Sequence, residues 1–207
     1  MKSESIDIPT GVIHGRFQIL HNDHLRYIMA GKERCRHLVI GITNPDPGLT
    51  REAASDRKRS HPQANPLTYF ERYLMVTAVM DELGVNRHDF SIVPFPINIP
   101  GLYQYYVPLD AVFFLTIYDD WGRQKLRYFK SLGLKTVVLW EVSPEEKGIS
   151  SSDIRQRMTA GQEWRDLVPP SVYRMANQWN IPDRLQNIRD GLYHTNSKPT
   201  CLFTKPD

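Results

Sequence analysis

The 207-residue sequence has only two cysteines, Cys35 and Cys201, and no apolar run that approaches the length of a membrane span. The cysteines show neither metal-ligand spacing nor the pattern of a disulfide framework, so we predict free thiols in a reducing compartment. The opening segment MKSESIDIPTG is polar and lacks the apolar core of a signal peptide. These absences predict a cytoplasmic protein that does not bind a membrane.

Several catalytic and nucleotide-binding motifs are also missing. The sequence has no G-x-x-x-x-G-K-[ST] phosphate loop and no G-x-G-x-x-G fingerprint, which argues against the common NTPases and dinucleotide-dependent oxidoreductases. It shows no Ser-His-Asp or Cys-His set for nucleophilic catalysis. The formal net charge is only +3, so the overall charge does not indicate a nucleic-acid partner.

The strongest chemical signal lies in residues 11–31, GVIHGRFQILHNDHLRYIMAG. An apolar run ends at Gly15, Arg16 follows, and His21 and His24 stand three residues apart before an amphipathic run. This pattern predicts a strand, a turn and the first turn of a helix. Helix N-termini attract anions, and side chains at i and i+3 share one helix face. We therefore predict a phosphate site; zinc is not favoured, because no third ligand is evident.

Strand and helix patterns alternate along the rest of the chain. Asn22 or Asp23 is expected to cap the first helix, Thr68 and Glu71 have the spacing of a capping box, and Gly84 is a stop signal. The alternation predicts an α/β doubly wound fold with a parallel sheet. The predicted strands are at about 11–15, 37–43, 90–94, 110–116 and 135–140, and the predicted helices at about 22–34, 67–83 and 121–132.

A second anion site is predicted in residues 148–160, GISSSDIRQRMTA. Serines at a helix start cap the helix, its first N–H groups attract anions, and Arg155 adds a cation. Two helix N-termini, each with a cation, suit a nucleoside triphosphate. Phosphoryl and nucleotidyl transfer depend mainly on positioning and charge neutralisation, so no protein nucleophile is needed.

Residues 44–66 form a long polar segment with a basic cluster between positions 51 and 61. Two interpretations of this segment stay open, a solvated insertion or a lid that brings cations over phosphates. The cluster also motivates a functional alternative, a non-catalytic nucleotide- or RNA-binding module.

At this point the motifs resemble a known family. GRFQILHNDH resembles the GRFQPxHxGH motif, and GISSSDIRQRM the ISSTxIR motif, of the HIGH-motif nucleotidyltransferase superfamily. NPLTYFERYLMV, VPFPINI and WRDLVPPSVYRM resemble further segments of the archaeal-type nicotinamide-nucleotide adenylyltransferases, so that the likeness extends over about residues 11–185. The resemblance implies a Rossmann-like, five-stranded parallel sheet over residues 1–148, a small helical C-terminal part over 149–190, and a polar tail over 191–207.

The resemblance also implies a reaction. A phosphorylated acceptor, nicotinamide or nicotinate mononucleotide in the first instance, would attack the α-phosphorus of an NTP, ATP in the first instance, and release pyrophosphate with Mg²⁺. The relatives are commonly homo-oligomers, and no nucleic acid is expected as a partner. No protein side chain is assigned to the metal. The implied roles are catalysis by Arg16, His21, His24 and Arg155, nucleotide binding by Gly15, Phe17, Gln18, Ser150, Ser151, Ser152 and Ile154, and acceptor binding by Arg72, Asn98 and Tyr105.

The sequence departs from the family pattern at positions that concern the substrates. Ile19 replaces a proline, Asp23 replaces the glycine before the second histidine, and Asn98 stands where an aspartate is usual. Residues 116–122, TIYDDWG, replace the family's SGN segment. These departures indicate altered base and acceptor recognition. They leave open an alternative, cytidylyl or adenylyl transfer to a different phosphate or phosphonate acceptor.

Overall fold

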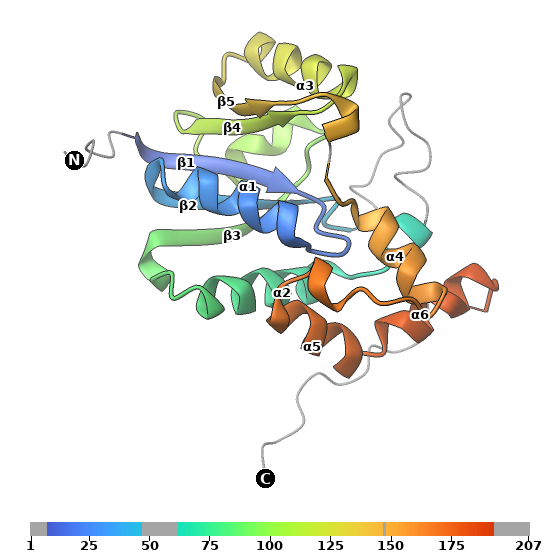
Figure 1. The fold of residues 1–207 in the computed structure, drawn as a ribbon. Helices are drawn as coiled ribbons and strands as arrows, with labels where there is room; N and C mark the ends of the chain where they lie inside the picture. The colour runs from blue at the N-terminus through green and yellow to red at the C-terminus, as the bar shows by residue number, and fades with distance from the viewer. Residues whose placement is uncertain (1–7, 47–61, 147, 193–207) are drawn as a thin grey trace.

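The computed structural model describes residues 8–46, 62–146 and 148–192. One sheet of five parallel strands has the order β3-β2-β1-β4-β5 (Figure 1). This confirms the predicted Rossmann-like, doubly wound α/β fold. The basic cluster at 51–61, Cys201 and the tail from 193 onward lie outside the described residues. The strands are β1 (Ile8–Gly15), β2 (Cys35–Thr43), β3 (Phe90–Phe95), β4 (Val112–Ile117) and β5 (Lys135–Glu141).

Helices cover both faces of the sheet, so the central strands are apolar on both sides. Successive strand residues point to opposite faces, and Val12 and Ile13 accordingly belong to two separate buried clusters. Helices α1 (Asn22–Lys32) and α2 (Tyr69–Glu82) pack over the face of Ile13, through residues such as Ile28 and Met75. Helix α3 (Asp120–Ser131) packs over the face of Val12 through Phe129. This two-sided burial explains the continuous apolar strand runs.

The helix ends follow the predicted signals with one exception. Thr68 and Glu71 form the predicted capping box of α2, and Gly84 follows this helix with a φ of 67°. The predicted cap of α1 by Asn22 or Asp23 is wrong, because His21 is the N-cap residue. An imidazole nitrogen thus accepts the capping hydrogen bond that an Asn or Asp side-chain oxygen usually accepts.

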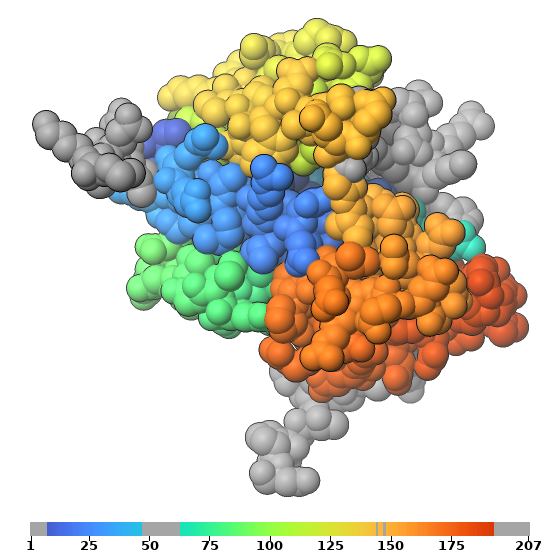
Figure 2. All heavy atoms as spheres, in the orientation of Figure 1, coloured from blue at the N-terminus to red at the C-terminus, as the bar shows by residue number. Residues whose placement is uncertain are grey.

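Three C-terminal helices close one end of the molecule, α4 (Ser151–Thr159), α5 (Pro170–Gln178) and α6 (Ile181–Arg189). Ile154, Val172 and Leu185 are buried in the same cluster as Ile13. In Figure 2 the orange atoms of α4 lie directly against the blue atoms of the β1–α1 segment. The C-terminal helices therefore help to shape the carboxyl edge of the sheet. No helix within the described ranges is both long enough and apolar enough to span a membrane.

Candidate active site

A pocket of about 380 Å³ lies at the carboxyl edge of the sheet, above β1 and β4. β4 returns to pair with β1 after the chain has moved outward through β2 and β3, so this gap is the topological switch point, where open α/β sheets bind ligands. In the described residues the two strands pair only through Gly11–Val112 and Val12–Phe113, in the middle of β1 and at the start of β4. The Tyr27 hydroxyl donates to the Phe114 carbonyl at 2.6 Å in the gap that follows.

Seven of the predicted site residues line this pocket. They come from the end of β1, the start of α1 and the start of α4, three segments that are far apart in the sequence. The seven are Gly15, Arg16, His21, His24, Ser150, Ser151 and Ser152.

Buried side chains fix the loop between β1 and α1. Phe17 has a φ of 52° and a fully buried ring. Gln18 is buried, and its amide exchanges two hydrogen bonds of 2.9 Å with the backbone N–H and carbonyl of Leu67. A left-handed backbone is uncommon for residues other than glycine and persists where the surroundings enforce it. Phe17 and Gln18 therefore hold the loop that presents Arg16, and their side chains do not line the pocket.

His21 and His24 form a stacked pair at the N-terminus of α1. Their ring centroids are 3.7 Å apart, with 27° between the ring planes. His21 Nδ1 accepts a hydrogen bond from the His24 backbone N–H at 3.4 Å, so a neutral His21 carries its proton on Nε2. The edge of the His24 ring meets Phe17 at a centroid distance of 5.1 Å. Two imidazoles thus face the pocket at a helix end where negative charge is favoured.

The protonation state of His24 is set by its surroundings. Burial lowers the pKa of His24 well below its usual value, and the nearby charges of His21 and Arg16 lower it further, against a hydrogen bond to the Ile19 backbone. His24 is therefore neutral near pH 7 in the protein alone. A bound triphosphate would place negative charge beside His24 and favour its protonated form. Hydrogen bonds from His24 to the phosphate would then be charge-assisted and stronger.

Acid is expected to destabilise the protein through its neutral histidines. Burial lowers the pKa of both His14 and His24 well below the usual value. The charge of Lys125 lowers the pKa of His14 further. In the unfolded chain both imidazoles titrate near 6.5, so below that pH the unfolded state binds more protons and the free energy of unfolding falls. Each histidine should contribute a slope of about 1.4 kcal/mol per pH unit below about pH 6.5 and none above about pH 7.5. Urea denaturation of wild type and His14→Leu at several pH values measures the slope of the free energy of unfolding against pH. Equal slopes in the two proteins below pH 6.5 would contradict the prediction for His14.

Helix α4 is attached to the β1–α1 loop by its first turn. Ser150 caps the helix in a reciprocal capping box with Asp153. Ser151 Oγ donates to the Ile19 carbonyl at 2.9 Å. Because Ser150 and Ser152 also line the pocket, the N-terminus of α4 faces the same space as the N-terminus of α1. Both helix ends favour an anion there.

Arg155 is turned toward the backbone rather than into the pocket. Its guanidinium donates to the Gln18 carbonyl and, at 3.1 Å, to Ser152 Oγ. Burial lowers its pKa. The structure therefore gives Arg155 an indirect part, in which it ties α4 to the loop that carries the histidines.

Arg72 has a similar position on the other side of the loop. It is 1 % exposed and does not line the pocket. Burial lowers its pKa to about 10, so it remains charged at neutral pH. Its guanidinium donates to the backbone carbonyls of Arg16, Thr43, Asn44 and Thr68. An acceptor would have to displace these bonds to reach it, which makes Arg72 a loop-positioning residue in this structure.

The remaining predicted residues also lie away from the pocket lining. Ile154 is fully buried in the core. Asn98 is exposed between β3 and the short helical segment Pro100–Tyr105. Tyr105, expected to stack on a nicotinamide ring, is 72 % exposed at the end of that segment. The structure thus does not bring Asn98 and Tyr105 to the histidines.

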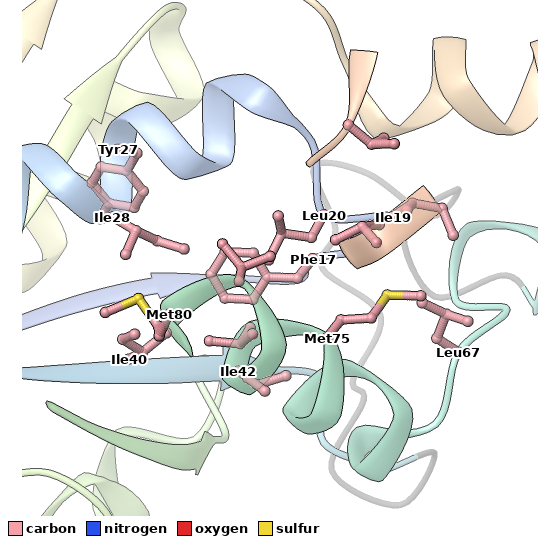
Figure 3. Packing of buried hydrophobic residues seen from close by; sticks show 14 of the residues in the cluster. Phe17, Ile19, Leu20, Tyr27, Ile28, Ile40, Ile42, Leu67, Met75 and Met80 are labelled. Carbon is pink, nitrogen blue, oxygen red and sulfur yellow. The ribbon is translucent and has the colours of Figure 1, made fainter. Parts of the chain in front are cut away.

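The two departures inside the histidine motif differ in their consequences. Ile19 is buried with Phe17 and Leu20 among the apolar side chains of the core, so it does not crowd the pocket (Figure 3). Asp23 does line the pocket, and its carboxylate lies so close to Gly148 that a Cβ atom there would clash with it. Of the two, only Asp23 changes the space that a substrate meets.

Sequence reasoning did not single out the wall of the pocket that is formed at the start of α3. Tyr118, Asp119, Trp121 and Lys125 line this wall. The sequence indicates only that residues 116–122 depart from the family pattern. It does not indicate that these residues and Lys125 line the pocket. Knowing that β4 lies beside β1 would have been enough, since the segment after β4 must then face the site.

The pocket offers little for a metal among its own side chains. In the parts of the chain that are described, no three His, Cys, Asp or Glu side chains come together as a metal cluster. Asp23 is one carboxylate at the pocket. Mg²⁺ usually takes one or two carboxylates and binds otherwise through substrate phosphates and water. The residues present fit that mode of binding.

Comparison with known proteins identifies the class of this site. Residues 12–157 match the cytidylyltransferase-like family, so the chain belongs to this family of HIGH-motif nucleotidyltransferases. It is 49% identical over 177 residues to a phosphonoformate cytidylyltransferase of Streptomyces viridochromogenes, covering 86% of this chain and 95% of the relative. It is 28% identical over 183 residues to a nicotinamide-nucleotide adenylyltransferase of Pyrococcus horikoshii, covering 88% and 90%.

Solved structures agree with the fold. A bifunctional NMN adenylyltransferase/ADP ribose pyrophosphatase from Francisella tularensis superposes with a TM-score of 0.62 at 15% identity. The match covers 87% of this chain and 52% of that protein, so the chain spans about half its length. A second structure of that bifunctional protein, with AMP and a manganese ion, gives a TM-score of 0.54 at 14% identity and the same coverage.

Proposed function

We propose that the protein transfers a cytidylyl group from CTP to a small phosphonate acceptor and releases pyrophosphate. The carrying observation is the 49% identity to a phosphonoformate cytidylyltransferase over nearly the whole length of that relative. The nicotinamide-nucleotide adenylyltransferases of Pyrococcus horikoshii and Thermococcus onnurineus are 28% and 24% identical to this chain. This favours the phosphonate alternative over adenylylation of nicotinamide mononucleotide.

The pocket geometry supports the same choice. Asn98 and Tyr105, the positions expected to recognise a nicotinamide nucleotide, do not line the pocket. Asp23 takes the place of a glycine in the adenylyltransferase motif, and its carboxylate narrows the pocket beside Gly148. The phosphate-facing set of Arg16, His21 and His24 is compatible with either reaction.

The reaction balances without a protein nucleophile. A phosphonate oxygen of the acceptor forms a bond to the α-phosphorus of CTP, and the bond from this phosphorus to the oxygen shared with the β-phosphorus breaks, so that this oxygen leaves with pyrophosphate. Arg16, His21 and His24 donate hydrogen bonds to the phosphoryl oxygens, where negative charge develops. The N-terminus of α4, at Ser151 and Ser152, holds the leaving pyrophosphate. Mg²⁺, when bound, neutralises phosphate charge.

Pyrophosphate release from a matrix of substrates tests this proposal. CTP, ATP, UTP and GTP are each combined with phosphonoformate, nicotinamide mononucleotide or no acceptor, with Mg²⁺ or with EDTA. We expect CTP with phosphonoformate to exceed ATP with nicotinamide mononucleotide by about 10²-fold or more in kcat/KM, a discrimination that pocket fit can supply. EDTA should abolish turnover.

Other outcomes of the matrix are decisive as well. Faster turnover of ATP with nicotinamide mononucleotide would overturn the proposal in favour of adenylylation. No pyrophosphate from any pair, together with tight and salt-sensitive RNA binding, would favour the non-catalytic alternative.

A further inference from the structure

Helix α6 is joined to the start of α2 by an ion pair. Arg184 of α6 lies with Nη2 2.7 Å from Glu71 Oε1, and its Nη1 donates to Glu71 Oε2 at 2.9 Å. The Arg184 side chain is 18% exposed and the Glu71 side chain only 6%. Arg184 Nη1 also donates to the Pro66 carbonyl at 3.2 Å. The pair therefore holds the segment that leads into α2 through a contact that is largely shielded from water.

Packing and helix capping do not explain why this contact is charged. Helix α6 already packs into the core through Ile181 and Leu185. Glu71 completes the capping box of α2, where its Oε2 accepts from the Thr68 N–H at 2.8 Å, but glutamine serves equally in such a box. Burying two charges costs free energy that apolar residues of similar volume would not cost. What a bidentate pair adds is a defined geometry.

The segment held in this way supports the phosphate-binding loop. The backbone N–H and carbonyl of Leu67 exchange hydrogen bonds of 2.9 Å with the Gln18 amide. The Thr68 carbonyl accepts from Arg72 Nε at 3.1 Å, and Nη1 of the same guanidinium donates to the Arg16 carbonyl at 3.0 Å. The backbone of Arg16 and Gln18 therefore depends on where Leu67 and Thr68 stand.

Helix α6 also contacts the second support of this loop. It packs against α4 and against the short helical turn Pro62–Ala64 (Figure 1). From α4, Arg155 donates to the Gln18 carbonyl and Ser151 Oγ donates to the Ile19 carbonyl at 2.9 Å. A displacement of α6 would thus reach the loop from both sides.

We propose that Arg184 and Glu71 are positioning residues for nucleotide binding, although neither side chain lines the pocket. Their ion pair fixes the segment that holds the Arg16 backbone, and with it the loop that leads to the two histidines. This inference rests on the nucleotide site of the proposed reaction and does not depend on the acceptor. It adds α6 to the elements that determine how tightly the nucleotide is bound.

Nucleotide affinity and stability, measured on the same variants, test this role. Calorimetric titration gives the Kd of a non-hydrolysable CTP analogue, and urea denaturation gives the unfolding midpoint. Arg184→Met leaves Glu71 without its partner, so we expect a lower midpoint and a Kd weakened by about 3–30-fold, the range in which residues outside a site usually act. Arg189→Met is the matched control on α6, because its ion pair with Asp190 is half exposed; it should change neither quantity.

The double variant Glu71→Gln/Arg184→Met separates positioning from stability. It removes both charges and keeps a residue that completes the capping box, so its midpoint should return most of the way to that of wild type. Its Kd should stay weakened by about 3–30-fold, because α6 no longer holds the segment. Leu38→Ala is the opposite case. Leu38 is fully buried near the start of β2, so its loss should lower the midpoint and leave the Kd unchanged.

Hydrogen–deuterium exchange of the free protein adds a readout that needs no nucleotide. The peptide over residues 15–20 should exchange faster in the double variant than in wild type or Leu38→Ala. Unchanged exchange there, wild-type affinity in the double variant, or a Kd that follows the midpoint in every variant would each overturn the positioning role.

An ATP analogue separates this inference from the proposed reaction. Wild type that binds the ATP analogue and not the CTP analogue would overturn the proposed function. The same loss of affinity for the ATP analogue in the double variant would then leave the positioning role standing. No binding of either analogue by wild type would overturn both.

Discussion

Replacing His24 with alanine is expected to lower kcat by about 10²–10³-fold, the usual effect of losing one preorganised donor to transition-state charge. His24 lies at the pocket, and its Nδ1 has no hydrogen-bond partner among the described residues. Its contacts in the fold include the stack on His21 and the edge contact with Phe17. The loss should therefore appear mainly in kcat, measured by pyrophosphate release, with a small change in the free energy of unfolding.

His21 needs a different substitution, because it is also the cap of α1. His21→Asn keeps a side chain that caps helices well but removes the imidazole, whereas His21→Ala removes both. Both variants should lose about 10²–10³-fold in kcat. Only His21→Ala should also lose about 1 kcal/mol of stability, the usual cost of losing a cap. Wild-type turnover in His21→Asn and His24→Ala would contradict a phosphate site at this helix.

The fold was predictable because its signals are local. The strand and helix patterns, the Thr68–Glu71 capping box and the stop at Gly84 all act over a few residues, and the structure has each of them. The strand boundaries shift by up to three residues, as for β1, which starts at Ile8 rather than at 11. Such boundaries depend on pairing with neighbouring strands, which a single sequence does not display.

The candidate site was predictable where one motif carries several of its residues. Gly15, Arg16, His21 and His24 follow one another within ten residues, and the structure places all four at the pocket. The predicted cap failed because an imidazole nitrogen can accept the same hydrogen bond as an Asn or Asp oxygen.

The roles of the two arginines, and the presence of Lys125 at the pocket, depend on contacts between segments that are far apart in the sequence. Arg155 donates a hydrogen bond to the carbonyl of Gln18, 137 positions away in the sequence, and Arg72 donates one to the carbonyl of Arg16, 56 positions away. A cationic side chain near a phosphate motif looks the same in sequence whether it meets the ligand or a carbonyl. Lys125 reaches the pocket only because β4 returns beside β1.

Arg72→Met is expected to cause the largest loss of stability, about 3–5 kcal/mol, as in the removal of one partner from a buried charged network. The guanidinium satisfies carbonyls at the end of the β1 strand, at the end of β2 and at the start of α2. Methionine fills much of the volume but donates no hydrogen bond, so these carbonyls lose a donor in a place that water reaches poorly. Urea denaturation at pH 7 measures the loss.

Two further variants show whether stability depends on the planar, multi-donor guanidinium of Arg72 rather than on its charge or size. Arg72→Lys keeps the charge but presents a point-like ammonium that cannot meet carbonyls from three segments at once, so most of the loss should remain. Arg87→Met is the control, since its ion pair with Asp81 is half exposed and should contribute less than about 1 kcal/mol. A loss below about 1 kcal/mol in Arg72→Met would contradict the assigned role. Because the Arg16 carbonyl is one of the four acceptors, the folded Arg72→Lys protein should also show a raised KM for the nucleotide, which connects the stability of this loop to the site it carries.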